Sequence, residues 1–158
     1  MAESELPPVV VRLARWDDVA SFSALRLQWQ DEEPSPEFEH RFRGWFDREW
    51  PSRWWWLALD DLRPVGMVNL KLFERMPTAQ NATVRWGSLC NLFVSPTHRT
   101  NGVGGSLVAA LLAAAREDEL VRVVLSPSEE SVPLYHRHGF TDATGLLAWY
   151  PGAVPAGR

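Results

Sequence analysis

The residues best placed to do chemistry form a glycine-rich turn. An apolar segment ends at Val94, and Gly102, Gly104 and Gly105 then lead directly into a segment with helical periodicity. The first N–H groups of a helix lack partners within the helix and carry the positive end of its dipole. Glycines at these positions remove the side chains that would keep an anion away. The turn therefore predicts a phosphate- or pyrophosphate-binding site built from main-chain amides.

Two better-known glycine-rich loops fit this segment poorly. A Walker A loop needs a lysine after its last glycine, and none follows here. A dinucleotide fingerprint starts correctly with Gly102-Val103-Gly104, but Leu107 stands where its third glycine belongs. A nucleotide-binding protein remains an alternative. On that hypothesis, we expect NAD or ATP to raise the thermal stability of the protein.

The elements that must position this turn follow from apolar periodicity and from turn residues. Val19, Phe22, Leu25 and Trp29 recur at helical spacing, and Val121 to Leu125 is a short apolar run typical of a strand. Antiparallel strands come first, followed by one β-α-β crossover that carries the turn, so the fold class is α+β. The expected elements are strands over 9–13, 54–59, 65–73, 83–94, 121–125 and 140–150, and helices over 17–30, 36–48, 102–117 and 129–138.

Length and composition restrict the classes of protein. The 158 residues are enough for one domain, expected over 1–150, with a Pro/Gly-rich tail over 151–158. A net charge of −4 argues against binding to nucleic acid. The longest small and apolar run, Val103 to Ala115, is 13 residues and too short to cross a bilayer. One cysteine and no ligand-type spacing predict no metal. We expect a cytoplasmic protein with no membrane partner, and a homodimer is left open.

Three short motifs follow one another along the second half of the chain. Arg99-Thr100-Asn101-Gly102-Val103-Gly104 fits [R/Q]-x-x-G-x-[G/A], and Val94-Ser95-Pro96 precedes it as V-x-P. Tyr135 follows later, five residues before Phe140 of a Gly-Phe pair. Together with the element order, these motifs resemble the GNAT (general N-acetyltransferase) superfamily over roughly residues 9–150.

The resemblance implies both a fold and an activity. The expected fold is a mixed, mostly antiparallel sheet of six to seven strands, flanked by about four helices and splayed between strands 4 and 5. The expected reaction is transfer of the acetyl group of acetyl-CoA to a primary amine by direct attack. The N–H of Val94 would polarise the thioester carbonyl.

The resemblance also assigns residues. The main chain of Leu92, Phe93 and Val94 should pair with the pantetheine arm, and Tyr135 should be the general acid that returns a proton to the CoA thiolate. Ser128 stands where relatives often have an asparagine that contacts CoA. The pyrophosphate should be received by Arg99, Thr100, Asn101, Gly102, Val103, Gly104, Gly105 and Ser106.

One departure concerns the general base. Ser88 and Val123 occupy the two strand positions where relatives often carry a glutamate, and neither side chain can accept the proton of the amine. Ordered water or an acid of the N-terminal segment would then have to accept it. A CoA-binding regulatory module without catalysis is the alternative that this departure supports.

An acidic, tryptophan-rich segment is the candidate for the acceptor site. Six of the nine tryptophans fall between positions 29 and 56, beside a short run of acids. Trp29, Asp31, Glu32 and Glu33 would attract a cationic amine through charge and cation–π contact. The alternative is a solvated helix face above buried tryptophans. We expect a small-molecule amine rather than a protein N-terminus.

Overall fold

A computed structural model describes residues 8–81, 84–143, 145 and 151. Its strands form one sheet in the order β1-β2-β3-β4-β5, antiparallel except for the parallel β4–β5 pair. The elements are β1 (Val10–Leu13), α1 (Val19–Gln30), α2 (Pro36–Glu49), β2 (Arg53–Asp60), β3 (Arg63–Glu74), β4 (Arg85–Val94), α3 (Val103–Glu117), β5 (Val123–Val124) and α4 (Val132–Arg137).

The expected α+β architecture and order of elements are confirmed. Five strands are described, against the six to seven expected, because residues 144 and 146–150 of the expected last strand lie outside the described residues. Two boundaries differ from the expectation. Residues 16–18 form a 3-10 turn before α1, in which the Asp18 carboxylate accepts from both Nη atoms of Arg12. Of the strand expected over 121–125, β5 comprises two residues.

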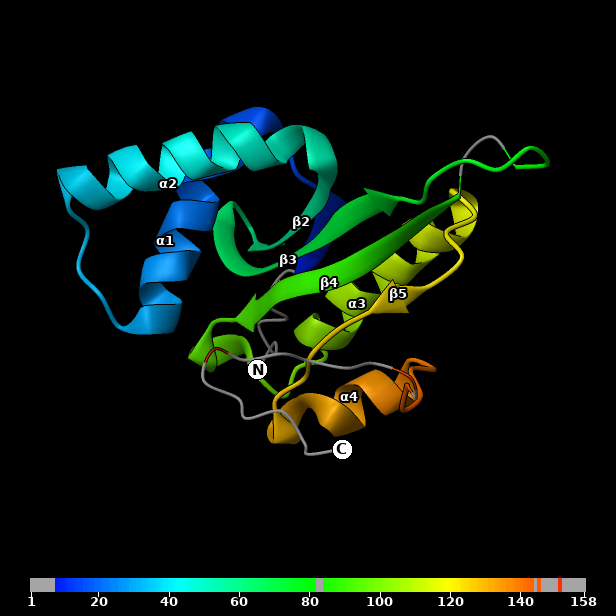
Figure 1. The fold of residues 1–158 in the computed structure, drawn as a ribbon. Helices are drawn as coiled ribbons and strands as arrows, with labels where there is room; N and C mark the ends of the chain where they lie inside the picture. The colour runs from blue at the N-terminus through cyan, green and yellow to red at the C-terminus, as the bar shows by residue number, and fades with distance from the viewer. Residues whose placement is uncertain (1–7, 82–83, 144, 146–150, 152–158) are drawn as a thin grey trace.

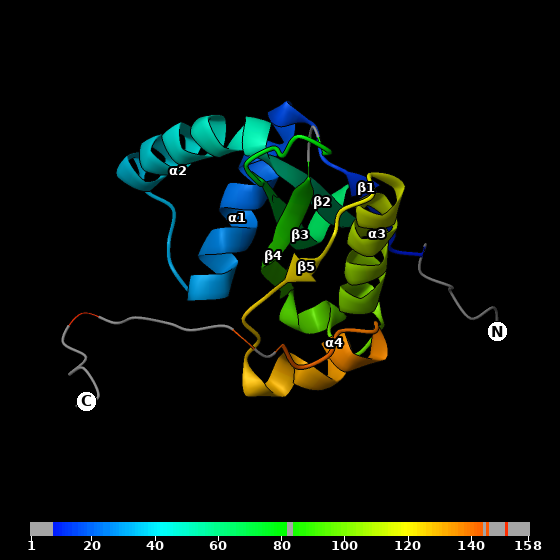
Figure 2. The ribbon, with the colours of Figure 1, turned by 45° about the vertical axis from the view of Figure 1, so that its right-hand side comes forward.

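The sheet separates two apolar clusters. Figures 1 and 2 show α1 and α2 on one face of the sheet and α3 on the other. Trp55 and Leu57 of β2 pack toward α1 and α2, whereas Trp56 and Ala58 pack in the cluster that contains α3. Both faces are covered, which explains why β2 is continuously apolar instead of alternating with polar residues.

A β-bulge in β4 changes which face its side chains meet. Met67 is opposite Phe93 and Asn69 is opposite Cys90, so β4 has one residue more than β3 across this interval. Asn91 in this interval has a left-handed φ of 57°. Leu89 lies in the α3 cluster, but Phe93, four residues later, lies in the α1–α2 cluster. The extra residue shifts the alternation by one position.

Candidate functional site

The strands β4 and β5 diverge as expected. They pair at Gly87 with Val123 and at Ser88 with Val124, and β4 then continues to Val94 (Figure 1). The two positions without a glutamate, Ser88 and Val123, therefore lie at the last point of contact between the strands. Beyond them, this edge of β4 pairs with no strand among the described residues.

The main chain of Val94 faces this open edge. The N–H of Ser95 donates to the carbonyl of Val65 on β3 at 2.8 Å, and neighbouring residues of a strand point their main-chain groups to opposite sides. The carbonyl of Val94 in turn accepts from Nε of Arg99, 3.1 Å away. The Val94 N–H thus faces the same open edge as its carbonyl.

The glycine-rich turn begins α3 with amides that have no partner within the helix. The first helical bond joins the Ser106 N–H to the Gly102 carbonyl at 2.9 Å, so the amides of Val103, Gly104 and Gly105 precede it. Gly102 has a φ of +77°, and a Cβ added there would meet no heavy atom within 4 Å. A left-handed glycine in open space is what a backbone anion site at a helix start requires. The residues present fit a pyrophosphate.

Arg99 connects this turn to the end of β4. Besides its bond to Val94, its guanidinium carbon lies 5.9 Å from the ring centroid of Phe93. Thr100 follows with a left-handed φ of 68° and an Oγ1 that donates to the carbonyl of Arg99 at 2.6 Å. The structure thereby brings the motif residues 92–94 and 99–106 together around one corner.

Tyr135 lies on α4, within the cluster that contains α3. Its side chain is 7% exposed, and its ring meets that of Phe140 edge-on at 5.6 Å. Burial raises the pKa of the Tyr135 phenol above its ordinary value. The hydroxyl therefore keeps its proton throughout the neutral range, as a proton donor must.

Ser128 lies in the loop before α4. It is exposed, and its Oγ donates to Oγ of Ser131 at 3.1 Å. This short side chain is already bonded within its own loop, so an incoming group would have to compete with Ser131.

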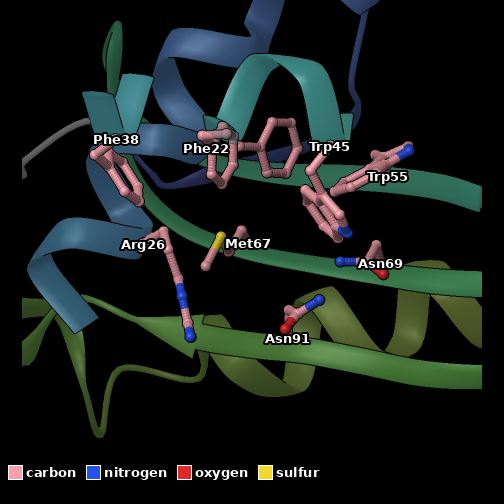
Figure 3. A pocket seen from close by; sticks show the side chains of 9 residues that line it. Phe22, Arg26, Phe38, Trp45, Trp55, Met67, Asn69 and Asn91 are labelled. Atoms are coloured by element: carbon pink, nitrogen blue, oxygen red, sulfur yellow. The ribbon is translucent and has the colours of Figure 1, made fainter. Parts of the chain in front are cut away.

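A cavity of about 230 Å³ opens between α1, α2 and the strands β2 to β4 (Figure 3). Its polar lining residues are Arg26, Asn69 and Asn91. Asn91 directly precedes Leu92, so the cavity adjoins the segment expected to hold the pantetheine arm. Its apolar walls are Phe22, Phe38, Phe42, Trp45, Trp55 and Met67.

A charged network fixes the orientation of Asn69. The side chain is 1% exposed, and its Oδ1 accepts from Nη1 of Arg53 at 2.8 Å. A guanidinium can only donate, so the amide nitrogen of Asn69 must point elsewhere. Figure 3 shows that nitrogen on the cavity side. Arg53 is itself held by Glu49, whose Oε2 accepts from Arg53 Nε at 2.7 Å and from Lys71 Nζ at 2.8 Å.

This network predicts a pH-dependent contribution to stability. Hydrogen bonds from Lys71 and then Arg53 hold the pKa of Glu49 below its ordinary 4.5. The contribution is therefore present above pH 4.5 and is lost as the pH falls through the lowered folded-state pKa. We expect Glu49→Gln to lower the free energy of unfolding by about 1 kcal/mol at pH 7, measured by urea denaturation.

The same measurement at pH 3 is the discriminating one. Below pH 4.5 the unfolded state binds a proton at Glu49 and the contribution declines, so the difference between the wild type and Glu49→Gln should be smaller at pH 3 than at pH 7. Asp47→Asn, an exposed position on the same helix, is the matched control and should change stability less at pH 7. A difference of equal size at both pH values would contradict the assignment.

The expected acceptor residues lie apart from the cavity. Asp31, Glu32 and Glu33 are exposed on the connection between α1 and α2 and do not line the cavity. Trp29 is 38% exposed and stacks on Phe93 with 5.5 Å between ring centroids. It borders the end of β4 rather than the cavity.

Sequence reasoning missed the three polar residues of the cavity. Asn69 carried a usable signal, because a single amide interrupts the otherwise apolar run from Val65 to Leu70. Arg26 gave no comparable signal on a helix with several polar residues. Asn91 reaches the cavity lining through the bulge, and strand alternation does not predict that position.

Two structural features are absent from the described part of the chain. No helix there is long and apolar enough to cross a membrane. Within the same residues, no group of three or more His, Cys, Asp or Glu side chains could hold a metal ion.

Comparison with known proteins gives one family. The model of the acetyltransferase (GNAT) family matches residues 18–140. Glucosamine 6-phosphate N-acetyltransferase of Trypanosoma brucei brucei is 30% identical over 78 residues, which are 49% of this chain and 51% of that protein. The chain thus matches about half the length of this curated relative.

Solved structures show the same fold. A predicted acetyltransferase of Clostridium acetobutylicum, solved with acetyl-CoA, superposes with a TM-score of 0.73 at 22% identity, covering 90% of this chain and 96% of that one. Glucosamine-6-phosphate N-acetyltransferase of Arabidopsis thaliana gives a TM-score of 0.71 at 13% identity, covering 91% and 99%.

Proposed function

The chain belongs to the acetyltransferase (GNAT) family, and on that premise we propose that it transfers the acetyl group of acetyl-CoA to a primary amine of a small molecule. One observation carries the proposal. β4 carries an edge that β5 leaves unpaired, the amides at the start of α3 follow its end after a connection of eight residues, and the cavity reaches β4 at Asn91, three residues before Val94. A donor with a phosphate-bearing arm and a separate acceptor could therefore meet at the end of β4.

The chain's own groups would hold the donor in three places. Main-chain groups of Leu92 to Val94 would pair with the amides of the pantetheine arm along the edge that β5 leaves open. The amides from Gly102 to Gly105 would receive the pyrophosphate, and Arg99 would add a positive charge beside them. Bound acetyl-CoA supplies the activated acyl thioester.

The proposed transfer needs three actions from the protein. The Val94 N–H polarises the thioester oxygen, and the cavity positions the amine for direct attack on the carbonyl carbon. The Tyr135 hydroxyl donates its proton to the sulfur as the carbon–sulfur bond breaks. Ser88 and Val123 cannot take the proton of the amine, so water or an acid of the N-terminal segment accepts it. Through solvent this proton then restores the Tyr135 hydroxyl. The products are the N-acetyl amine and free CoA.

Release of free thiol from acetyl-CoA in the presence of a panel of primary amines tests the proposal. We expect amine-dependent release with at least one small amine, together with the acetylated product by mass spectrometry. Binding of acetyl-CoA without turnover of any amine would instead indicate the regulatory module. Stabilisation by NAD or ATP but not by CoA would indicate the nucleotide-binding alternative.

A further inference from the structure

The lining of the cavity selects for one kind of amine. We propose that the acceptor is a small amine that carries an aromatic or apolar group and a carboxylate, as a free aromatic amino acid does. This inference rests on the proposed function, because it concerns the acceptor side of the same site. It goes beyond the proposed function because it names the chemical class of the amine, which the comparisons with known proteins do not give.

The walls are suited to a planar, apolar group. Trp45 meets Trp55 edge-on at 5.7 Å between centroids and 83° between planes, and Phe22 meets Trp55 at 5.1 Å and 69°. Met67 adds a polarisable thioether between these rings and β4 (Figure 3). Such walls favour ring stacking and apolar contact, and they offer little to a hydroxyl-rich sugar.

The polar groups of the cavity include two hydrogen-bond donors, the amide nitrogen of Asn69 and the guanidinium of Arg26. The amide nitrogen of Asn69 faces the cavity because its oxygen accepts from Arg53. The Arg26 guanidinium lies 5.1 Å from the ring centroid of Trp29, and among the described residues no Asp or Glu oxygen comes within 4 Å of its nitrogens. A carboxylate could bind Arg26 in bidentate fashion. The amide nitrogen of Asn69, on the other side of the cavity in Figure 3, offers a separate donor to a polar group of the ligand.

The charges around the cavity disfavour an acceptor with several positive charges. The titratable residue of the lining is Arg26, which is positive. Nearby acids have partners, because Glu39 accepts from Ser23 Oγ at 2.7 Å and Glu49 accepts from Arg53 and Lys71. The Arg53 guanidinium already lies 5.5 Å from the centroid of Trp45 and 6.0 Å from that of Trp55, so a second cation beside these two rings would also lie near a positive charge. A polyamine or aminoglycoside would gain little cation–π attraction and would be repelled by Arg26.

Volume restricts the acceptor further. About 230 Å³ is less than the ~300–1,000 Å³ of pockets that hold drug-sized ligands. One aromatic side chain with its amine and carboxylate is small enough for this space. The amine then lies toward Asn91 and the end of β4, where the thioester is expected.

Substrate specificity provides the test. The thiol-release assay compares phenylalanine with phenylalaninamide, phenethylamine, spermidine and glucosamine 6-phosphate. The amide and phenethylamine keep the ring and the amine but lack the carboxylate, whereas the sugar phosphate keeps an anion and lacks the apolar group. We expect kcat/KM for phenylalanine to exceed that for each of the others by about tenfold or more, as expected for one charge-assisted pair.

Two arginine variants locate the preference. In Arg26→Gln the preference for phenylalanine over phenylalaninamide should fall to about twofold, because glutamine keeps a donor but loses the charge. Arg41→Gln, on an exposed position of α2, removes the same charge outside the cavity lining and should keep the wild-type preference. An unchanged preference in Arg26→Gln would overturn the proposal, as would spermidine or glucosamine 6-phosphate being the best substrate.

Product binding separates this inference from the proposed function. Titration of N-acetylphenylalanine, followed by tryptophan fluorescence, reports on the cavity without any turnover. Binding that is weakened in Arg26→Gln, with no amine turned over, would support the cavity assignment and overturn the enzymatic function. Turnover of other amines without this binding would keep the enzyme and overturn the inference. Failure of both binding and turnover would overturn both.

Discussion

Replacing Gly104 by glutamate should raise the Kd for acetyl-CoA about 100-fold or more, equivalent to ~2.7 kcal/mol. The residue lies in the first turn of α3, where three amides precede the first helical bond. A carboxylate there would occupy the position proposed for the pyrophosphate and repel it. Isothermal titration of acetyl-CoA into the wild type and the variant measures the change.

The fold should tolerate this substitution. A Cβ at position 104 would lie 3.6 Å from Cδ2 of Leu134 and 3.7 Å from Cγ2 of Val94, which are ordinary contacts. A negative charge in the first turn of a helix is also favourable by about 0.3–1 kcal/mol. Thermal unfolding should therefore stay close to that of the wild type.

Gly104→Gln is the matched control, with the same length and no charge. It should weaken acetyl-CoA binding less than Gly104→Glu does, because it adds bulk without electrostatic repulsion. Wild-type affinity in a folded Gly104→Glu protein would remove the start of α3 from the donor site.

Replacing Tyr135 by phenylalanine should lower kcat by about 100-fold, the lower end of the range for a lost general acid. The ring packs in the cluster that contains α3 and meets Phe140 edge-on, and phenylalanine preserves both contacts. The Kd for acetyl-CoA should therefore stay near the wild-type value. Steady-state kinetics and titration on the same preparations separate the two effects, and an unchanged kcat would exclude Tyr135 from the reaction.

The pH dependence gives a second test of the same residue. Burial holds the pKa of the Tyr135 phenol above its ordinary value of 10. The proton donor is then fully protonated from pH 7 to pH 9, and it loses its proton only above pH 10. The ratio of wild-type to Tyr135→Phe turnover should accordingly be constant between pH 7 and 9. A ratio that changes with a midpoint in that interval would indicate another proton donor.

Local signals predicted much of the fold, including the conformation of the turn that we propose as part of the donor site. The helix over 36–48 was expected from its aromatic spacing, and α2 is Pro36–Glu49. The turn at Gly102 was expected from its position after an apolar segment, and that glycine is left-handed before α3. These features depend on neighbouring residues, which a single sequence displays directly.

The acceptor side could not be predicted in the same way. The cavity combines Arg26 of α1, Asn69 of β3 and Asn91 of β4, which are brought together by sheet register and helix packing. The run of acids after Trp29 was more conspicuous in the sequence, yet these acids lie on an exposed connection. Charge composition singled out Asp31, Glu32 and Glu33, and these side chains do not line the cavity.

The bulge at Asn91 divides β4 between the two layers of helices. Before the bulge, Leu89 of β4 packs in the cluster that contains α3. After the bulge, Phe93 of the same strand packs in the α1–α2 cluster. The residues proposed to bind the donor lie on β4, on α3 and on the connection between them. Most walls of the proposed acceptor cavity come from α1, α2 and β2. Substitutions on α1, α2 and β2 would therefore reshape the proposed acceptor cavity without changing the residues proposed to bind the donor.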